Sequence, residues 1–302
     1  MNKLTIFTPT FNRANNLPTL YKVLLNQTSQ NFLWLIIDDG STDETKILVE
    51  SWIKDQKLNI EYIYKENGGK HTAIEVANNL CKTDYIVIID SDDILTNNAV
   101  ETFYEMYQNV DNDELLIGIL FPRVYMTEEL VRNDFPKTGE KKFLYEINNY
   151  NYRGGEVNHF LKTNIIKKFG FPHFSGEKFV RESVWTDNFF YDHKFWIYSK
   201  AINLLEYTED GYTKQGFNLL YKNPYGFLCA LKSNAYYAIK ARFSLKEKVI
   251  ATAKYYGWAK AMRLNKKKIE GYKISFFYRF SGRILSLATR RVYKKRIKEC
   301  QR

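Results

Sequence analysis

The stretch YIVIIDSDD, residues 85–93, decides the fold, because an apolar run stops there at three carboxylates. The run is short, rich in β-branched residues and lacks alternation, as expected for a strand buried on both faces. Asp90, Asp92 and Asp93 follow at its carboxyl end, where open α/β sheets bind ligands. Carboxylates this close repel one another unless a cation compensates their charge. Because carboxylate oxygens are the ligands that Mg²⁺ and Mn²⁺ prefer, the cluster indicates a site for one of these ions. The alternative is an acidic loop in which Asp92 or Asp93 caps the next helix.

Strand-like and helix-like segments alternate through the first half of the chain. We expect strands over 4–10, 33–40, 60–66, 85–90 and 115–121, and helices near 16–26, 43–55, 70–81 and 97–108. This order favours right-handed crossovers and a mainly parallel sheet with helices on both faces. The predicted fold class is therefore α/β and Rossmann-like. Residues 122–154 are expected to be irregular, and 156–172 to form a strand and a short helix.

Three further loops should lie at the carboxyl ends of these strands. In TPTFNR (8–13), Phe11 and Arg13 could meet a base and a phosphate, and in DDGSTD (38–43), Asp38 and Asp39 offer acceptors beside a sharp turn. In ENGGKH (66–71), two glycine N–H groups and Lys70 could meet an anion. Each loop alone could be an ordinary turn, but their common edge favours a nucleotide site. The absence of GxGxxG and GxxxxGK[ST] disfavours dinucleotide-binding enzymes and P-loop ATPases.

Composition excludes several other classes. With 302 residues and 45% hydrophobic content, the chain can form a large core with an appendage. Three widely spaced cysteines, without a CxxC pair, suggest neither a disulfide framework nor a zinc site, and fit a reducing cytosol. The N-terminus does not resemble a signal peptide, and no segment offers the roughly 18 apolar residues of a spanning helix. We therefore expect a protein that is neither secreted by that route nor membrane-spanning.

The motifs TPTFNR, DDGSTD, ENGGKHTA and the DSDD after VII carry a family resemblance. In order and spacing, over residues 4–125, they resemble the nucleotide-sugar half of inverting glycosyltransferases of family 2, which have the GT-A fold. The resemblance implies that Asp92 binds Mn²⁺ or Mg²⁺, which would neutralise the diphosphate leaving group. It also implies a set of nucleotide-binding residues, with Asp90 on the ribose side: Pro9, Thr10, Phe11, Arg13, Asp39, Gly68, Lys70, Asp90 and Ser91.

The acceptor side is expected around FSGEKFVRESVWTD, residues 174–187. Its spacing resembles a signature of family 2 members that decorate surface polysaccharides, but Ser183 stands where relatives carry the second acid of a Glu-Asp pair. Glu182 is therefore our candidate general base, with Glu177 and Asp187 as rivals. Glu182 could instead be a solvated acid paired with a neighbouring cation, and Trp185 could stack on a sugar or belong to the core.

The resemblance implies a metal-dependent hexosyltransferase that acts on a UDP-linked donor. Its acceptor would be a hydroxyl of a lipid-linked oligosaccharide in bacterial capsule or surface polysaccharide assembly. Two alternatives stay open. Ser183 makes a noncatalytic glycan- or nucleotide-binding module conceivable, and a metal-dependent nucleotidyltransferase uses a related sheet.

The C-terminal part is expected to be helical, over 226–242, 245–263 and 272–298. We therefore expect a catalytic domain over 1–225, in which 1–125 binds the donor and 126–225 the acceptor, and a helical extension over 226–302. YTEDGYTKQG (207–216) resembles a loop that closes over the nucleotide in relatives. Residues 266–302 hold 13 Lys or Arg against two Glu, so this tail carries the whole net charge of +11.

The last helix combines apolar and basic residues at helical spacing. Such a helix suggests an interfacial membrane anchor, which would place the protein in the cytoplasm at the inner face of the membrane. It could instead pack on the domain by its apolar face. Nucleic acid is not expected, because no recognition motif accompanies the charge, and the oligomeric state stays open. The apolar residues are Ile274, Phe276, Phe277, Phe280, Ile284, Leu285, Leu287, Ala288 and Val292.

Overall fold

The computed structural model describes residues 3–110, 113–125, 135–147, 156–205, 212–240, 243–269 and 271–301, with side chains from 216 onward in the fifth range. The chain forms two compact units. The first comprises Met1–Gly170 and Phe189–Thr208, and the second comprises Phe171–Asn188 and Glu209–Arg302. The division therefore does not follow the boundary expected between residues 225 and 226.

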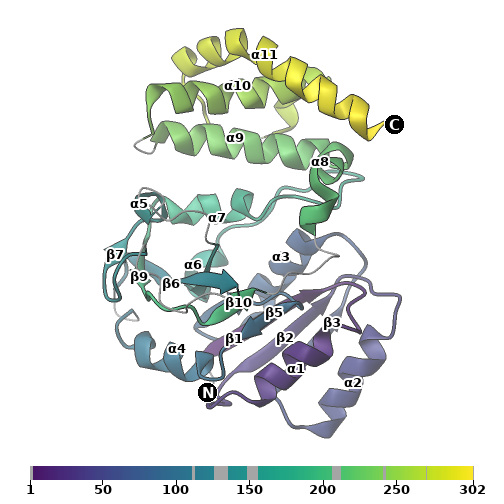
Figure 1. Ribbon diagram of the computed structural model, residues 1–302, viewed down its shortest axis with the longest axis vertical. Coiled ribbons are helices and arrows are strands. Elements are labelled where there is room, and N and C mark those ends of the chain that lie inside the picture. The colour runs from purple at the N-terminus through teal and green to yellow at the C-terminus, as the bar shows by residue number, and fades with distance from the viewer. Residues whose placement is uncertain are drawn as a thin grey trace. The chain divides into compact units, whose positions relative to one another are not determined.

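The first unit is built on a ten-stranded sheet with the order β3-β2-β1-β4-β8-β6-β10-β5, and β9 joins β6 to β7 (Figure 1). Its elements follow the predicted alternation closely. They are β1 (Leu4–Thr10), α1 (Leu17–Leu25), β2 (Leu33–Asp38), α2 (Thr45–Asp55), β3 (Ile60–Tyr64), α3 (Lys70–Leu80), β4 (Tyr85–Ile88), β5 (Asp93–Leu95), α4 (Ala99–Tyr107), β6 (Leu116–Tyr125), β7 (Lys141–Lys142), α5 (Leu144–Ile147), β8 (Val157–Lys162), α6 (Thr163–Ile166), β9 (Lys194–Ile197) and β10 (Asn203–Leu205).

The sheet is parallel in one half and mixed in the other. Strands β3, β2, β1 and β4 pair in parallel, as the helical crossovers between them require. Strand β8 then runs antiparallel to both β4 and β6. The expected mainly parallel sheet is thus correct for the first four strands and imprecise beyond them, because β8 lies antiparallel between β4 and β6. The α/β class and the helix-flanked sheet are confirmed.

Helices cover both faces of the parallel half. One face forms a core with α1, α2 and α4, in which Trp34 of β2 stacks near Tyr21 and Trp52. Helix α3 packs on β1 and β2 with buried Ala73 and Ile74. The start of β4 is buried, as its unbroken apolar run predicts.

The stretch 122–154 is less irregular than expected. Strand β6 continues to Tyr125, and β7 and α5 follow. Other parts of it, 126–134 and 148–155, lie outside the described residues, as does 207–211 of the segment expected to close over a nucleotide.

The second unit is helical. It contains most of α7 (Ser183–Phe190), then α8 (Tyr212–Lys222), α9 (Pro224–Lys240), α10 (Leu245–Ala261), a 3₁₀ turn (Lys266–Lys268) and α11 (Phe276–Cys300). Trp258 of α10 is fully buried, lies 4.9 Å from the Phe227 ring and donates from Nε1 to the Pro224 carbonyl at 2.9 Å. The three predicted C-terminal helices are present. Among the described helices, none has the length and apolar character needed to cross a membrane.

Candidate functional site

The four predicted loops meet at one edge of the sheet. Thr10 pairs with Asp38 and Phe7 with Ile88, so the parallel strands β1, β2 and β4 end together. Asn12 links the first two loops, since its N–H donates to Ser41 Oγ and its Oδ1 accepts from Thr42 N, each at 2.8 Å. The predicted common edge is therefore present.

The second loop turns sharply at Gly40, which has a φ of +86°. A Cβ there would lie 2.8 Å from the backbone nitrogen of Asn67 in the third loop. Only glycine allows both the backbone conformation and this close approach. The sharp turn expected from the sequence is thus what brings the DDGSTD and ENGGKH loops into contact.

Asp39 organises the glycine loop. Its Oδ1 accepts from Gly68 N at 2.9 Å and from Lys65 Nζ at 2.6 Å, and its Oδ2 accepts from Gly69 N at 2.7 Å. These glycine N–H groups, which we expected to meet an anion, are therefore directed at a buried carboxylate. The sequence analysis missed Lys65, whose signal is a cation directly after the third strand.

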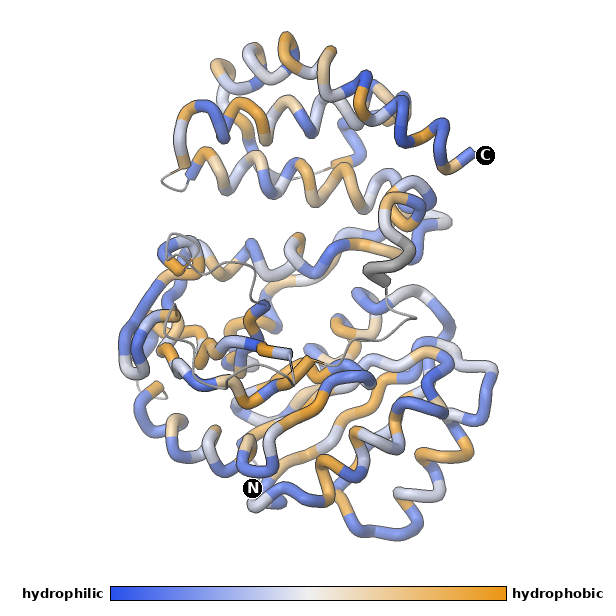
Figure 2. Tube along the Cα trace, in the orientation of Figure 1, coloured by the Kyte–Doolittle hydropathy of each residue, from blue (hydrophilic) through white to orange (hydrophobic). Residues whose placement is uncertain are grey.

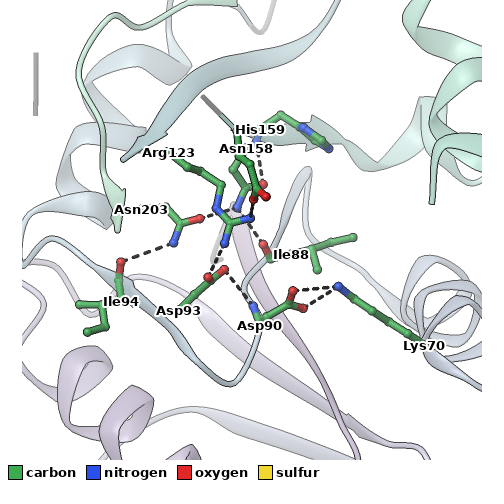
Figure 3. A network of polar contacts seen from close by, with 10 residues as sticks. Lys70, Ile88, Asp90, Asp93, Ile94, Arg123, Asn158, His159 and Asn203 are labelled. Atoms are coloured by element: carbon green, nitrogen blue, oxygen red, sulfur yellow. Dashed lines mark hydrogen bonds and ion pairs between the residues drawn. The ribbon is translucent and has the colours of Figure 1, made fainter. Parts of the chain in front are cut away.

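Two cations compensate the acidic loop, Asp90–Asp93 (Figure 3). Lys70 Nζ lies 2.8 and 2.9 Å from the two oxygens of Asp90. Arg123 of β6 forms an ion pair with Asp93 and another, at 2.8 Å, with Glu156. The Asp93 carboxylate also accepts the Asp90 N–H at 3.3 Å, which closes the loop. Asp93 is thus held inside the protein.

These charges set the protonation of the loop. Burial opposes ionisation of Asp90, but the ion pair with Lys70 outweighs it and holds the pKa of Asp90 below its ordinary value. Burial and the charge of Asp90 raise the pKa of Asp93, and Arg123 opposes that rise. Burial and the nearby Arg123 lower the pKa of His159 to about 4, so this histidine is neutral at pH 7.

Buried amides hold the end of β4 behind the loop (Figure 3). Asn158 Nδ2 donates to the Ile88 carbonyl at 2.9 Å and to Asn203 Oδ1 at 3.0 Å. Asn203 in turn donates to the Ile94 carbonyl at 3.4 Å. The sequence analysis missed Arg123, Asn158 and Asn203. Polar residues inside otherwise apolar strand-like runs are the signal that could have identified them.

The other expected donor-site residues lie around these loops. Phe11 is 44% exposed, Pro9 and Arg13 are half-buried, and Thr10 and Ser91 are buried. Arg13 is close enough to the acidic loop to lower the pKa of Asp90. The edge therefore presents an exposed aromatic ring and cationic side chains beside the acids.

The acidic loop suits a cation that is held mainly by a substrate. Asp92 is half-buried in this loop, and its neighbours Asp90 and Asp93 pair with Lys70 and Arg123. Within the described residues, no group of three or more His, Cys, Asp or Glu could hold a metal. A single protein carboxylate fits Mg²⁺ or Mn²⁺, since these ions commonly take their remaining oxygens from phosphates and water.

The three base candidates belong to the second unit and differ in their contacts. The Glu177 carboxylate accepts from Tyr225 N at 2.8 Å and Gly226 N at 2.7 Å, so it caps α9. Asp187 accepts from Ser233 Oγ at 2.5 Å, and burial raises the pKa of Asp187 to about 7. Both rivals therefore hold helices together.

Glu182 lies half-buried directly before α7. Its carbonyl accepts the first helical N–H groups, from Trp185 and Thr186. Trp185 itself is 1% exposed and stacks on Phe171, so its side chain is part of the core and does not form a sugar platform.

Comparison with known sequences gives one family and a set of bacterial relatives. A family model described as "Glycosyl transferase family 2" matches residues 5–180. The "Teichoic acid poly(glycerol phosphate) polymerase" of Staphylococcus epidermidis is 35% identical over 168 residues, which are 55% of this chain and 23% of that protein. The "Minor teichoic acid biosynthesis protein GgaA" of Bacillus subtilis is 28% identical over 200 residues, 64% of this chain and 40% of the relative. The matches thus span less than half the length of these relatives.

Solved structures share the fold at low identity. Staphylococcus aureus TarS 1–349 in complex with UDP-GlcNAc superposes with a TM-score of 0.61 at 15% identity, covering 98% of this chain and 92% of that one. The mannosyltransferase PcManGT from Pyrobaculum calidifontis, in complex with GDP-Man and Mn²⁺, superposes with a TM-score of 0.53 at 15% identity. The match covers 95% of this chain and 75% of that one. At such identity the likeness establishes the architecture alone, and it agrees with the expected GT-A type.

Proposed function

Because the chain belongs to glycosyl transferase family 2, we propose that it moves a sugar, with inversion, from a UDP-linked donor to a hydroxyl of a lipid-linked saccharide. The observation that carries this proposal is the meeting of four loops at one sheet edge, with exposed Phe11 beside paired acids and cations. Relatives named for teichoic acid synthesis support an acceptor from bacterial surface polymers, which include capsule.

On the donor side, each loop has a distinct role in the proposal. Phe11, with Pro9 and Thr10, would lie against the base, and Asp39 would accept from the base imide while it holds Gly68. Arg13 and Lys70 would face the diphosphate, because both lie near the acidic loop. Asp90, with Ser91, would lie at the ribose side. Phe11 would offer its ring to the face of the base, and the polar pairings would join groups of complementary charge or hydrogen-bonding character.

Asp92 would hold the Mn²⁺ or Mg²⁺ ion, which when bound supplies neutralisation of the diphosphate leaving group. The chain's own cations act on the same charge, since Lys70 and Arg13 lie next to the loop. Arg123 contributes indirectly, because its ion pair with Asp93 helps to fix the acidic loop.

On the acceptor side, Glu182 would act as the general base. Its carboxylate would take the proton of the acceptor hydroxyl as that oxygen bonds to the anomeric carbon and the bond to the diphosphate breaks. Attack from the face opposite the leaving group inverts the anomeric centre. The carboxylates of Glu177 and Asp187, the rival bases, accept hydrogen bonds within the second unit.

A lipid-linked acceptor would place the enzyme in the cytoplasm, peripherally at the inner face of the membrane. The basic helix at the C-terminus supports that location, because its cations suit anionic lipid.

The test is product analysis with a panel of UDP-, GDP- and CDP-linked sugars. Release of UDP with sugar transfer to a membrane-lipid extract, dependent on Glu182, supports the proposal. Release of pyrophosphate from a nucleoside triphosphate and a sugar phosphate would indicate a nucleotidyltransferase. Saturable binding of a nucleotide sugar without turnover would indicate a noncatalytic binding module.

A further inference from the structure

Helix α11 packs on α10 through its smallest residues. Gly282 and Ser286 are the buried residues of α11, and a Cβ added at Gly282 would lie 2.5 Å from Thr252 Cγ2. A Cβ added at Gly257 of α10 would lie 2.0 Å from Thr289 Oγ1. Small residues let two helix backbones approach closely, so the contact needs few large apolar side chains.

Polar contacts secure the same face. Thr289 Oγ1 donates to the Ala253 carbonyl at 2.8 Å, and Lys260 Nζ donates to Ser286 Oγ at 2.9 Å. Tyr293 adds an edge contact with Trp258 at 5.2 Å. The alternative that α11 packs by its apolar stripe is therefore wrong, because the small-residue face makes the contact and leaves the large side chains outside.

The first half of the outward face is apolar. The large side chains begin with two adjacent phenylalanines and then follow at spacings of three or four, which places them on one side of the helix. They remain 55–75% exposed, whereas a surface helix ordinarily turns such a stripe to the core. The members of this apolar segment are Phe276, Phe277, Phe280, Ile284 and Leu287.

The second half of the same face is cationic. Continuing the spacing from Leu287 leads to Arg291, then Lys294, Lys295 and Lys298, all exposed. Figure 2 shows hydrophilic residues, drawn in blue, concentrated toward the C-terminal end of α11. One side of a single helix therefore changes from apolar to basic midway along its length.

We propose that α11 is a two-part docking helix for an anionic bilayer surface. The apolar segment lies in the interface between headgroups and acyl chains, and the basic segment lies over the lipid phosphates. Aromatic and aliphatic side chains favour the former, and Lys and Arg favour the latter. This inference rests on the membrane location proposed above and assigns it to the two segments of α11; because docking requires neither donor nor acceptor, its failure can be distinguished from a failure of glycosyl transfer.

Charge selects this partner over two others. A second copy of the chain would bring two tails of +11 together, and like charges repel. Nucleic acid would satisfy the basic segment but leave the apolar segment in water. An anionic bilayer satisfies both segments at once.

The first experiment uses the full chain and two vesicle types, phosphatidylcholine alone and phosphatidylcholine mixed with phosphatidylglycerol. The triple variant R291Q/K294Q/K298Q should lower partitioning onto the anionic vesicles at least tenfold and remove the salt dependence. The triple variant F276S/F280S/I284S should also partition onto the anionic vesicles at least tenfold less. The fraction of protein that stays bound at high salt should disappear. All six side chains are exposed, so the melting temperature should stay near that of the unmodified chain.

Helix α2 and the turn that follows it provide matched controls in the first unit. K46Q/K54Q/K57Q removes the same charge, and I47S removes a side chain that is 70% exposed. Both should bind vesicles as the unmodified chain does. Equal effects of control and α11 variants would overturn the proposal, as would binding of full chain that is indifferent to phosphatidylglycerol.

A second experiment tests the division of the helix. In a chain carrying C300S, an environment-sensitive probe is attached through F280C or through K298C. On anionic vesicles the probe at 280 should be protected from an aqueous quencher and the probe at 298 should not. Equal protection of both would overturn the two-part arrangement. Preference for a DNA duplex over the vesicles, or dimerisation abolished by the α11 variants, would assign the face to those partners instead.

Discussion

The three acids of the acidic loop have different partners although they are neighbours in the sequence. Asp90 faces Lys70, Asp93 faces Arg123, and Asp92 lies half-buried between them. A buried carboxylate is costly without a compensating charge, so the two paired acids depend on cations from other elements. Asp92, which the family resemblance gives as the metal ligand, therefore lies in a loop whose flanking acids are held by protein cations.

Asp92→Asn should keep the fold and remove most transfer activity together with metal-dependent donor affinity. The amide keeps the size of the side chain but lacks the charge that would bind a divalent ion. Activity and donor affinity are measured as functions of Mn²⁺ concentration. Turnover equal to the unmodified chain at saturating Mn²⁺ would show that Asp92 is not a ligand.

Glu182→Gln should leave donor binding nearly unchanged and lower kcat by about 10²- to 10⁴-fold, as for loss of a general base. Glu177→Gln serves as the matched comparison, because it weakens the cap of α9. Its main effect should be a lower melting temperature, with only a small effect on kcat. If Glu177→Gln or Asp187→Asn abolishes turnover in a folded chain while Glu182→Gln is mild, the assignment of the base fails.

Arg123→Met should destabilise the first unit by about 3 to 5 kcal/mol, because it leaves the buried Asp93 without its cation. The double variant R123M/D93N should recover much of this loss, since the unpaired charge is then removed as well. Denaturant unfolding of both variants checks the coupling. A double variant no more stable than R123M would show that the ion pair is not the cause.

At the scale of elements, Asp187 joins α7 to α9 through Ser233 inside the helical unit. Its pKa of about 7 exceeds the ordinary value of 3.8, because burial opposes the charge. Between these values the folded chain binds more protons at this site than the unfolded chain. The contribution of Asp187 to stability is therefore full below about pH 4 and is lost as the pH rises through about 7.

Asp187→Asn should remove this pH dependence. The free energy of unfolding of the variant, relative to that of the unmodified chain, should therefore increase as the pH rises from about 4 and become constant above about pH 7. Ser233→Ala removes the hydroxyl that supports the ionised form, so it should raise the pKa of Asp187 further and extend the loss of stability to higher pH. Unfolding is followed by circular dichroism across this range. A constant difference between Asp187→Asn and the unmodified chain would contradict the assignment.

At the scale of the whole molecule, charge and chemistry are divided along the chain. The loops of the donor site belong to the first unit, whereas residues 266–302 hold the entire net charge. Donor binding and membrane docking can therefore be varied separately by substitution.

A UDP-sugar at a hundred times its dissociation constant should stabilise the native chain by about 2.7 kcal/mol. We expect UDP-linked sugars to raise the melting temperature more than GDP-linked ones at equal concentration. The α11 variants should show the same shift, because their changes lie outside the donor loops. A larger shift with GDP-linked sugars would refute the assignment of UDP.

The sequence alone was sufficient for the first four parallel strands, the helices that connect them, the C-terminal helices and the common edge of the four loops. Apolar periodicity and turn residues act over a few positions, and parallel pairing then places the loop ends together. For the same reason the Gly40 turn could be predicted from DDGSTD.

The tertiary structure alone decided which groups pair. Arg123 meets Asp93 across 30 positions of sequence, and Asp39 takes the glycine N–H groups, because strand order and register set these distances. Periodicity likewise located the apolar stripe of α11 but not its orientation. That orientation depends on Gly257 and Gly282, whose close backbone approach let the small-residue face pack and left the large side chains in solvent.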